Sequence, residues 1–193
     1  MSGVASTLTG LKDIYYAKLT ADTAAEGQTA GSTTYGTPKK LGHAISVDMN
    51  PNVETATLYG DNAAVATKTK LKEITLTIDT TDIPLEDRAI ILGHTYDSTT
   101  GGVTVKGDDA APYVAIMFEA TTADDTSHFY KFYKGKFAPT QQQIETAGEN
   151  INWQTPSMEG TFIARASDSK IYDMLDGANS GSSTLASNWF TSV

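Results

Sequence analysis

The sequence predicts a mainly β protein with one amphipathic α-helix and several long, irregular arms. Three observations predict this class. Thr, Ala and Gly are abundant, with 29 threonines among 193 residues, and threonine is enriched in strands. Several segments alternate apolar and polar residues with a period of two, as half-buried strands do. One segment has the spacing of an amphipathic helix.

Length, charge and cysteine content exclude several classes of protein. A chain of 193 residues is long enough for a single domain with a substantial core. It has no cysteine, which rules out disulfides, thiolate metal sites and cysteine nucleophiles. The formal net charge of −9 argues against a dedicated nucleic-acid binder, which would be basic. Neither a membrane-spanning apolar run nor the pattern of a signal peptide is present.

Two strands are expected in the first quarter of the chain. Residues 13–20 (DIYYAKLT) form the first, and the low-complexity stretch 21–36 follows as a loop or hairpin tip. Residues 41–49 alternate and form the second strand. The sequence Asn50-Pro51-Asn52 is expected to end it, because proline lacks a backbone N–H donor.

Residues 50–70 form an unusual connection. They contain a short strand-like piece at 54–59, a turn at Gly60-Asp61-Asn62, and an Ala/Thr/Lys stretch. The clearest strand of the chain, 71–80, then follows, with Ile74, Leu76 and Ile78 inward. A connection of about 20 residues with little apolar content usually has a function of its own. Lys68, Lys70 and Lys72, spaced by two, are expected on one strand face, either against an anionic partner or as a charged edge.

Residues 82–93 are predicted to form the single helix. Asp82 is a suitable N-cap and Pro84 suits the first turn. Gly93 favours a helix end. The apolar face expected to pack on the body consists of Leu85, Ala89 and Leu92.

Three further strands are predicted in the second half. Residues 113–120 (YVAIMFEA) are apolar throughout, so both faces of this strand should be covered. Residues 128–137 return as its hairpin partner, and 157–165 form another strand. Residues 170–175 are a helical candidate, and the Gly/Ser-rich stretch 177–187 is a flexible tail.

No constellation of catalytic or ligand residues is apparent. The three histidines lack metal-ligand spacing, and no glycine-rich phosphate loop is found. The acid pairs Asp108-Asp109 and Asp124-Asp125 lack the cadence of a calcium loop and are read as solvated turns. We therefore expect no catalytic residue, no cofactor-binding residue, no metal and no enzymatic activity. The histidines, expected to be structural or exposed, are His43, His94 and His128.

Two aromatic groups leave alternatives open. The rings of residues 129–137, interleaved with lysines, could stack on bases or fill the core from a half-buried strand. Trp189 and Phe190 follow a Gly/Ser-rich stretch and have no local core. They should dock either on their own domain or on a neighbouring subunit.

The residues alone thus indicate a non-enzymatic β domain with arms made to contact something. Arms of low apolar content become ordered only where a partner supplies the burial, which favours a subunit of an assembly. A carbohydrate- or surface-binding module is the alternative, with Tyr15, Tyr16 and Tyr59 as exposed platforms.

An ordered set of segments resembles the major tail proteins, also called tail tube proteins, of bacteriophages with long, non-contractile tails (siphophage type). The segments are residues 10–19 (GLKDIYYAKL), 35–41 (YGTPKKL), 44–59 (AISVDMNPNVETATLY), 93–94 (GH), 111–115 (APYVA), 133–137 (YKGKF) and 154–162 (QTPSMEGTF), with the Trp189-Phe190 end.

The resemblance implies a single tail-tube domain over residues 1–193, with a β-sandwich or barrel-like body flanked by one α-helix and extended by a stacking loop and N- and C-terminal arms. Its parts would be an N-terminal arm at 1–12, a loop at 50–70 that reaches the adjacent ring, the helix at 82–93 and a C-terminal arm at 166–193. Trp189 and Phe190 would anchor the C-terminal arm. The loop residues implied in contacts between rings are Pro51, Asn52, Val53, Glu54, Leu58, Tyr59, Asp61, Lys68 and Lys70.

The resemblance also implies a function and partners. Hexameric rings of this homo-oligomer would stack into the virion tail tube, the conduit for DNA ejection into the host. The tape measure protein, the tail terminator and baseplate or distal tail proteins would be its partners, with assembly in the host bacterial cytoplasm and no membrane. A lumen sharing the subunit's negative charge would let DNA pass without binding. Another ring-forming tail or secretion-tube component is the related alternative.

Overall fold

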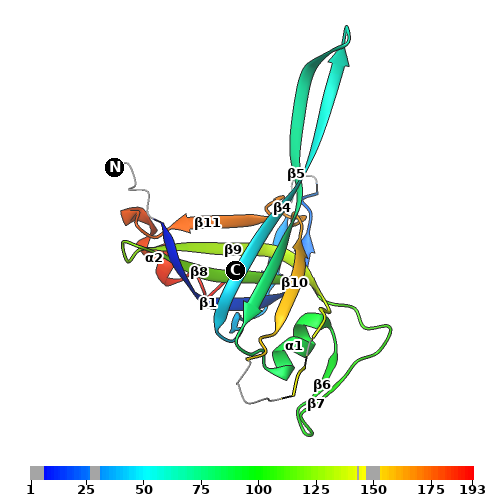
Figure 1. The fold of residues 1–193 in the computed structure, drawn as a ribbon, viewed down its shortest axis with the longest axis vertical. Helices are drawn as coiled ribbons and strands as arrows, with labels where there is room; N and C mark the ends of the chain where they lie inside the picture. Colours follow the sequence, from blue (N-terminus) through cyan, green and yellow to red (C-terminus); the bar gives the residue numbers. More distant parts are fainter. Residues whose placement is uncertain (1–6, 27–30, 143, 147–152) are drawn as a thin grey trace.

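Most of the chain belongs to one antiparallel sheet that folds over on itself (Figure 1). The computed structural model describes residues 7–26, 31–142, 144–146 and 153–193. Seven strands follow one another in the order β2-β1-β8-β9-β10-β5-β4, with β3 paired to β1 and β11 to β9, and β6 and β7 form a separate pair. The elements are β1 (Leu8–Thr23), β2 (Ser32–Tyr35), β3 (Lys39–Lys40), β4 (Ala44–Gly60), β5 (Ala63–Thr80), α1 (Leu85–Leu92), β6 (Thr95–Asp97), β7 (Gly102–Thr104), β8 (Val114–Thr122), β9 (Ser127–Ala138), β10 (Ser157–Phe162), β11 (Tyr172–Asp176), a 3-10 turn (Ser180–Ser182) and α2 (Ser183–Ser187). The expectation of a mainly β, sandwich-like body with a short flanking helix is confirmed.

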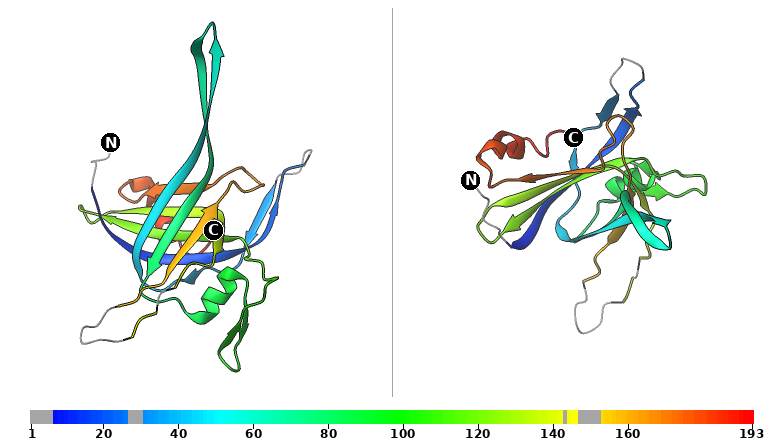
Figure 2. Two further views of the ribbon diagram at one scale, coloured as in Figure 1. Left: turned by 45° about the vertical axis from the view of Figure 1, so that its right-hand side comes forward. Right: turned by 90° about the horizontal axis from the view of Figure 1, so that it is seen from above.

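The sheet forms two layers because β9 changes partners along its length. One edge of β9 pairs with β8, whereas the other pairs with β11 at residues 128–132 and with β10 at residues 135–138. The layer of β10, β5 and β4 therefore crosses the layer of β1, β8, β9 and β11 (Figure 2). Gly135 lies at this bend, and a Cβ there would overlap the ring of Phe162. Only glycine allows the ring to approach the backbone so closely.

The main core lies between the two layers. Ile74, Leu76 and Ile78 of β5 are buried, while the alternating threonines face outward, as predicted. They pack against aromatic residues of the other layer, among them Phe132 and Phe162, whose ring centroids are 5.3 Å apart. β8 is buried on both faces, also as predicted, because the core covers one face and the C-terminal segment covers the other.

The aromatic strand β9 belongs to the core, so the core interpretation of residues 129–137 is correct and the base-stacking alternative is not. Its rings are at most 9% exposed. Lys131, one of the interleaved lysines, is itself buried. The buried rings are Phe129, Tyr130, Phe132, Tyr133 and Phe137.

Helix α1 is shorter than the predicted 82–93. It begins after Pro84, and no side chain caps its N-terminus, so the predicted role of Asp82 is wrong. Gly93 ends the helix with φ +77°, as predicted. The predicted buried face is correct for Ala89 and Leu92 but wrong for Leu85, which is 57% exposed; Ile91 is the third buried residue of the helix.

The segment 50–70 is a regular hairpin rather than an irregular loop. β4 runs through Pro51, which lies opposite Ile74, so the predicted strand break at residues 50–52 is wrong. An edge strand tolerates proline, because its outward N–H has no ladder partner to lose. A register shift between Asn52 and Val53 bends the ladder just beyond this point. The turn at Asp61-Asn62 forms as predicted, with both residues at positive φ (50° and 63°).

The described residues of both predicted arms pack on the body. Residues 8–12 of the N-terminal arm belong to β1, which pairs with β8, and residues 1–6 lie outside the described part. The helical prediction for 170–175 is wrong, because β11 pairs there with β9. The flexible tail predicted at 177–187 contains the 3-10 turn and α2. In the stretch 21–36, β1 and β2 form the expected hairpin; residues 27–30 lie outside the described part.

Candidate assembly surfaces

The hairpin of β4 and β5 leaves the body and extends along the longest axis of the molecule (Figure 1). We call residues 50–72 the projecting hairpin. Every residue from 50 to 70 is exposed except Gly60, which is half-buried. The loop residues implied by the resemblance all lie on it, namely Pro51, Asn52, Val53, Glu54, Leu58, Tyr59, Asp61, Lys68 and Lys70.

The ladder of the projecting hairpin extends to the turn with register shifts at Asn52/Val53 and Leu58/Tyr59, and few side-chain contacts among the described residues support it. Asn52 Nδ2 donates to Glu73 Oε1 at 3.0 Å, and the hydroxyls of Thr55 and Thr69 are 3.3 Å apart. A two-stranded hairpin without a covering surface is marginally stable in water. This segment therefore has the form of an element that another surface stabilises.

The two faces of the projecting hairpin differ in chemistry. Residues directly opposite one another in an antiparallel ladder share a face. Lys68 and Lys70 share one, as predicted, and Lys72 falls at the register shift. Val65, which the sequence did not single out, lies against Gly60: a Cβ there would be 3.0 Å from Val65 Cγ2. The pairs on the lysine face are Glu54–Lys70, Ala56–Lys68 and Leu58–Ala66; the pairs on the opposite face are Thr55–Thr69 and Thr57–Thr67.

The outer face of β4, β5 and β10 is uniformly polar. The register places Asp48, Thr77 and Glu159 in one row across the three strands. Ser46 Oγ donates to Asp79 Oδ2 at 2.6 Å in the next row. This surface cannot pack as a core, and its charged groups on these strands are carboxylates. We call it the acidic face; it consists of Ser46, Asp48, Asn50, Thr75, Thr77, Asp79, Ser157, Glu159 and Thr161.

Both ends of the strand order present an open edge. β4 ends the order on one side, and β2 and β3 line β1 on the other. Within the described residues, β4 pairs with β5 alone, so one side of its 17-residue backbone is unpaired. Such an edge is a template for pairing with another chain.

The C-terminal residues dock on their own domain. Trp189 is 8% exposed, contacts Phe129 with ring centroids 6.0 Å apart, and donates from Nε1 to the Tyr130 carbonyl at 3.2 Å. Phe190 stacks on Tyr15 at 4.8 Å between centroids. Of the two alternatives for this pair, the structure shows packing within the chain.

Burial beneath Trp189 changes the chemistry of Lys131. Its Nζ lies 4.5 Å from the centroid of the Trp189 ring and donates to the Ser192 carbonyl at 2.7 Å. Desolvation by burial lowers the pKa of Lys131 to about 8, although the charge of Asp173 acts in the opposite direction. A lysine that loses part of its charge near pH 8 thus lies under the C-terminal segment.

A second polar contact fastens the β1–β2 hairpin to the body. The carboxylate of Asp22 accepts hydrogen bonds from Lys134 Nζ at 2.7 Å and from the N–H groups of Ala166 and Ser167 at 2.8 and 3.1 Å. Burial alone would raise the pKa of Asp22, but these donors outweigh it and lower that pKa.

The remaining titratable groups have structural roles or are exposed. His94 Nδ1 lies 2.9 Å from Asp109 Oδ2, which also accepts the N–H of Lys106. The hydrogen bond from the Lys106 N–H is the largest cause that lowers the pKa of Asp109, and the hydrogen bond with His94 lowers it further. Asp109 therefore joins the loop at residues 106–109 to His94, just beyond the end of α1. The prediction of a solvated turn is wrong for Asp109. Within the described residues, no three His, Asp or Glu side chains gather as metal ligands would.

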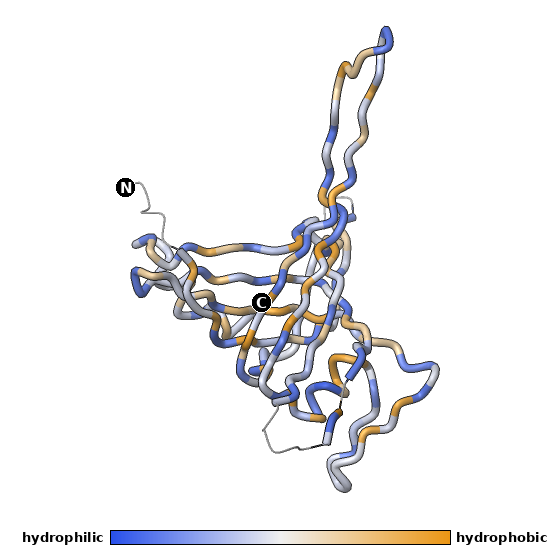
Figure 3. Tube along the Cα trace, in the orientation of Figure 1, coloured by the Kyte–Doolittle hydropathy of each residue, from blue (hydrophilic) through white to orange (hydrophobic). Residues whose placement is uncertain are grey.

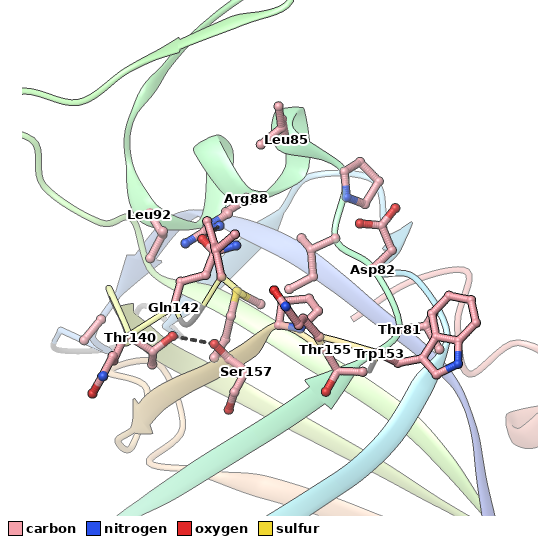
Figure 4. A pocket seen from close by; sticks show the side chains of 18 of the residues that line it. Thr81, Asp82, Leu85, Arg88, Leu92, Thr140, Gln142, Trp153, Thr155 and Ser157 are labelled. Atoms are coloured by element: carbon pink, nitrogen blue, oxygen red, sulfur yellow. Dashed lines mark hydrogen bonds between the residues drawn. The ribbon is translucent and has the colours of Figure 1, made fainter. Parts of the chain in front are cut away.

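Two hollows adjoin helix α1. The larger, of about 770 Å³, lies between α1 and the segments around Thr140 and Trp153 (Figure 4). Arg88 Nη1 donates to Gln142 Oε1 there at 2.9 Å, and the Thr140 hydroxyl donates to the Ser157 carbonyl. The smaller, of about 340 Å³, lies on the β6–β7 side of α1 and has mainly apolar walls.

The surface-binding alternative loses most of its support. Tyr16 is 2% exposed and donates to Asp87 at 2.6 Å, and Tyr15 is partly covered by Phe190. Tyr59 remains exposed, but it lies near the tip of the projecting hairpin. The three tyrosines do not form a common platform.

Comparison with known proteins identifies the family. A family described as phage tail tube protein matches residues 10–185, which is most of the chain. No match was found among curated proteins. Within the described part of the chain, no helix is long and apolar enough to cross a membrane. With its β body, open edges and projecting hairpin, the chain belongs to the phage tail tube protein family and is a structural component of the virion tail.

Proposed function

We propose that this protein assembles into hexameric rings that stack into the tail tube of a phage with a long, non-contractile tail, and that the tube conducts DNA during ejection. The projecting hairpin is the observation that carries this proposal. It is a long, exposed, two-stranded extension without a covering surface in its own body. The family membership and the resemblance support assembly into a tube. The hairpin offers a contact between one ring of that tube and the next.

The open edges support ring formation. Pairing the free side of β4 in one copy with the β2–β3 side of the next would satisfy both edges with one kind of contact. This contact is head-to-tail, and such contacts generate rings when the rotation closes. The number six follows from the resemblance.

The acidic face supports a role as the wall of the lumen. Its rows contain Asp48 with Glu159, and Asp79 with serines, and no large apolar side chain lies among them. A wall of carboxylates and hydroxyls repels DNA phosphates, so DNA can move along it without binding. Lys136, at the β9 end of one row, is the nearest cation in the ladder.

The projecting hairpin is proposed to reach the adjacent ring. Its lysine face and its apolar tip would both contact the neighbour, which would cover a ladder that is marginal alone. The proposed contact residues are those implied by the resemblance, Pro51, Asn52, Val53, Glu54, Leu58, Tyr59, Asp61, Lys68 and Lys70.

The tube is proposed to assemble in the host bacterial cytoplasm. Its further partners would be the tape measure protein within the lumen, the tail terminator at one end and distal tail or baseplate proteins at the other. Trp189 and Phe190, docked on their own domain in this structure, would hold the C-terminal segment in place against a neighbouring subunit.

Electron microscopy of the purified protein tests this function. The wild type should form rings or hollow tubes, either alone or after nucleation by partner tail proteins. A variant in which residues 55–68 are replaced by an Asn-Gly turn should keep the β body, judged by circular dichroism, but should form no stacked tubes. A monodisperse monomer that never enters rings, tubes or virions would contradict the proposal.

A further inference from the structure

Five of the exposed large apolar residues lie at two opposite ends of the molecule. Leu58, Tyr59 and Val65 lie near the tip of the projecting hairpin, each about two-thirds exposed. Leu85 and Val105, 57% and 64% exposed, flank the smaller hollow beside α1. Figure 1 shows the hairpin at one end of the longest axis and α1 with β6 and β7 at the other, and Figure 3 shows apolar residues at both. Exposed apolar groups of this kind mark interaction surfaces.

The hollow beside α1 is a preformed apolar groove. Its floor comes from Ala89 and Leu92, which are at most 6% exposed, and its rim from Leu85 and Val105. Val103 and Pro139 add further apolar walls, and Arg88 and His94 are the polar residues of the lining. A volume of about 340 Å³ is near the lower limit of ligand pockets and suits one or two side chains.

Contacts around the groove hold it in shape. The His94–Asp109 pair fixes the chain beyond α1, and its side chains are 11% and 12% exposed. At Gly93, φ is +77° and a Cβ would overlap the carbonyl of Ala110, so the loop is packed onto the helix end. The β6–β7 ladder, which includes Val103 opposite Tyr96, supports the outer wall.

The hairpin tip has the shape to enter such a groove. A two-residue turn closes it, and Val65 lies against Gly60, on the face that carries Leu58. The register shift between Leu58 and Tyr59 leaves Val65 out of the pairing and turns it toward Gly60, two residues from Leu58. Leu58 and Val65 therefore form a small apolar knob.

Charge favours the same match. The first ten residues of β5 contain three lysines and no acid, whereas Asp82, Glu86 and Asp87 lie at the start of α1. Asp87 is largely covered, because it accepts a hydrogen bond from Tyr16 and its side chain is 13% exposed. Asp82 is exposed, and Glu86, 3.4 Å from Lys39 Nζ, is about half exposed, so these two carboxylates are open to a further cation.

We propose that the groove beside α1 receives the tip of the projecting hairpin of a second copy of this chain, with Leu58 and Val65 entering between Leu92, Val103 and Val105. The tip and the groove lie at opposite ends of one subunit, so the contact forms between copies. It is a head-to-tail contact that leaves a free tip and a free groove at the ends of each stack, as a growing tube requires. The inference rests on the proposed tube function, and it names the acceptor for the hairpin.

Disulfide trapping tests the contact directly, because the chain has no native cysteine. Leu58→Cys and Val105→Cys are placed in separate copies that carry tags of different size, mixed, assembled and oxidised. The matched control pairs Leu58→Cys with Met174→Cys, since Met174 is as exposed as Val105 but lies on β11. Circular dichroism of each variant verifies that the β body is retained.

The expected result is a cross-linked heterodimer when Leu58→Cys is paired with Val105→Cys. No such product should form when Leu58→Cys is paired with Met174→Cys. Tubes that form without the Leu58–Val105 product overturn this inference and leave the proposed function intact. Wild-type protein that forms no ring or tube under any nucleation overturns the proposed function. The absence of the cross-link overturns the inference in either case.

Discussion

The ammonium of Lys131 lies 4.5 Å from the centre of the Trp189 ring, so the C-terminal segment closes over a cation buried in β9. Trp189 covers the lysine, and the Ser192 carbonyl accepts a hydrogen bond from Lys131 Nζ at 2.7 Å. This contact joins two segments 58 positions apart in the printed sequence and explains why β8 and β9 are covered on both faces. Its energetics can be measured in the isolated subunit.

Stability should rise with pH between about 8 and 10. The folded pKa of Lys131 is about 8, below the ordinary lysine value of about 10.4, so the unfolded state binds more protons in this interval. The free energy of unfolding therefore increases as pH rises through it. Urea denaturation at pH 7.5, 8.5 and 9.5 should show the rise in the wild type but not in Lys131→Met. Equal slopes in the two proteins would contradict the buried position of the lysine.

Trp189→Ala should destabilise the isolated subunit by about 3–5 kcal/mol, as large-to-small substitutions of buried aromatics do. The side chain is 8% exposed and contacts Phe129 and Met117. The same variant should also lose the pH-dependent rise, because Lys131 becomes exposed to water. Leu185→Ala, at a site that is 60% exposed, is the control and should change stability by less than about 0.5 kcal/mol. Similar denaturation midpoints for the two variants would show that Trp189 is not docked.

Asp22→Asn should lower stability by about 1–3 kcal/mol at pH 7, because Lys134 loses its charged partner and two backbone N–H groups lose a strong acceptor. The folded pKa of Asp22 is lowered, so its contribution is present above the unfolded pKa of about 3.9 and disappears as pH falls through the folded pKa. Thermal denaturation at pH 7 should separate wild type from variant clearly, and at pH 3 the gap should shrink. Asp124→Asn, in the exposed β8–β9 turn, should leave both values unchanged. A gap as wide at pH 3 as at pH 7 would argue against the ion pair.

Gly135→Ala should destabilise the bend of the sheet by about 1–3 kcal/mol through overpacking against Phe162. Replacing the Phe162 ring by the smaller leucine side chain should relieve the clash. The double variant Gly135→Ala with Phe162→Leu should therefore lose less stability than the sum of the losses of the two single variants. A double-mutant cycle from urea denaturation gives this coupling. Additive losses would mean that the glycine is not required by the ring.

Replacing the carboxylates of the acidic face should make the tube bind DNA. We expect Asp48→Lys with Glu159→Lys to leave assembly intact and to retain double-stranded DNA in a salt-dependent manner, since counterion release drives such binding. The control, Asp108→Lys with Asp124→Lys, makes the same change of charge on exposed loops. Sedimentation of tubes with labelled DNA measures the difference. Equal retention by both pairs would place the lumen on another face.

Local patterns predicted the elements whose signals are local. The alternation of Ile74, Leu76 and Ile78 predicted β5, and Gly93 predicted the end of the helix, because periodicity and positive φ act within a few residues. The turn at Asp61-Asn62 was predicted for the same reason. The resemblance placed residues 50–70 as one functional unit, but it did not indicate their hairpin structure.

The errors arose where distant partners decide the structure. Pro51 is compatible with β4 because that strand has a free edge, which local sequence does not reveal. Residues 172–176 form a strand because β9 offers an unpaired side, although their spacing suggested a helix. The acidic face could not be predicted, because it depends on the register that sets Asp48 beside Thr77 and Glu159.

The most direct test of the account is amide hydrogen exchange in the projecting hairpin, compared between isolated subunits and assembled tubes. In the isolated subunit, the amides of residues 53–70 should exchange rapidly, since their side chains are exposed and nothing covers the ladder. In tubes the same amides should become strongly protected, while those of the buried strand β8 should be slow in both states. Hairpin amides that exchange as rapidly in tubes as in free subunits would contradict the claim that this segment joins one ring to the next.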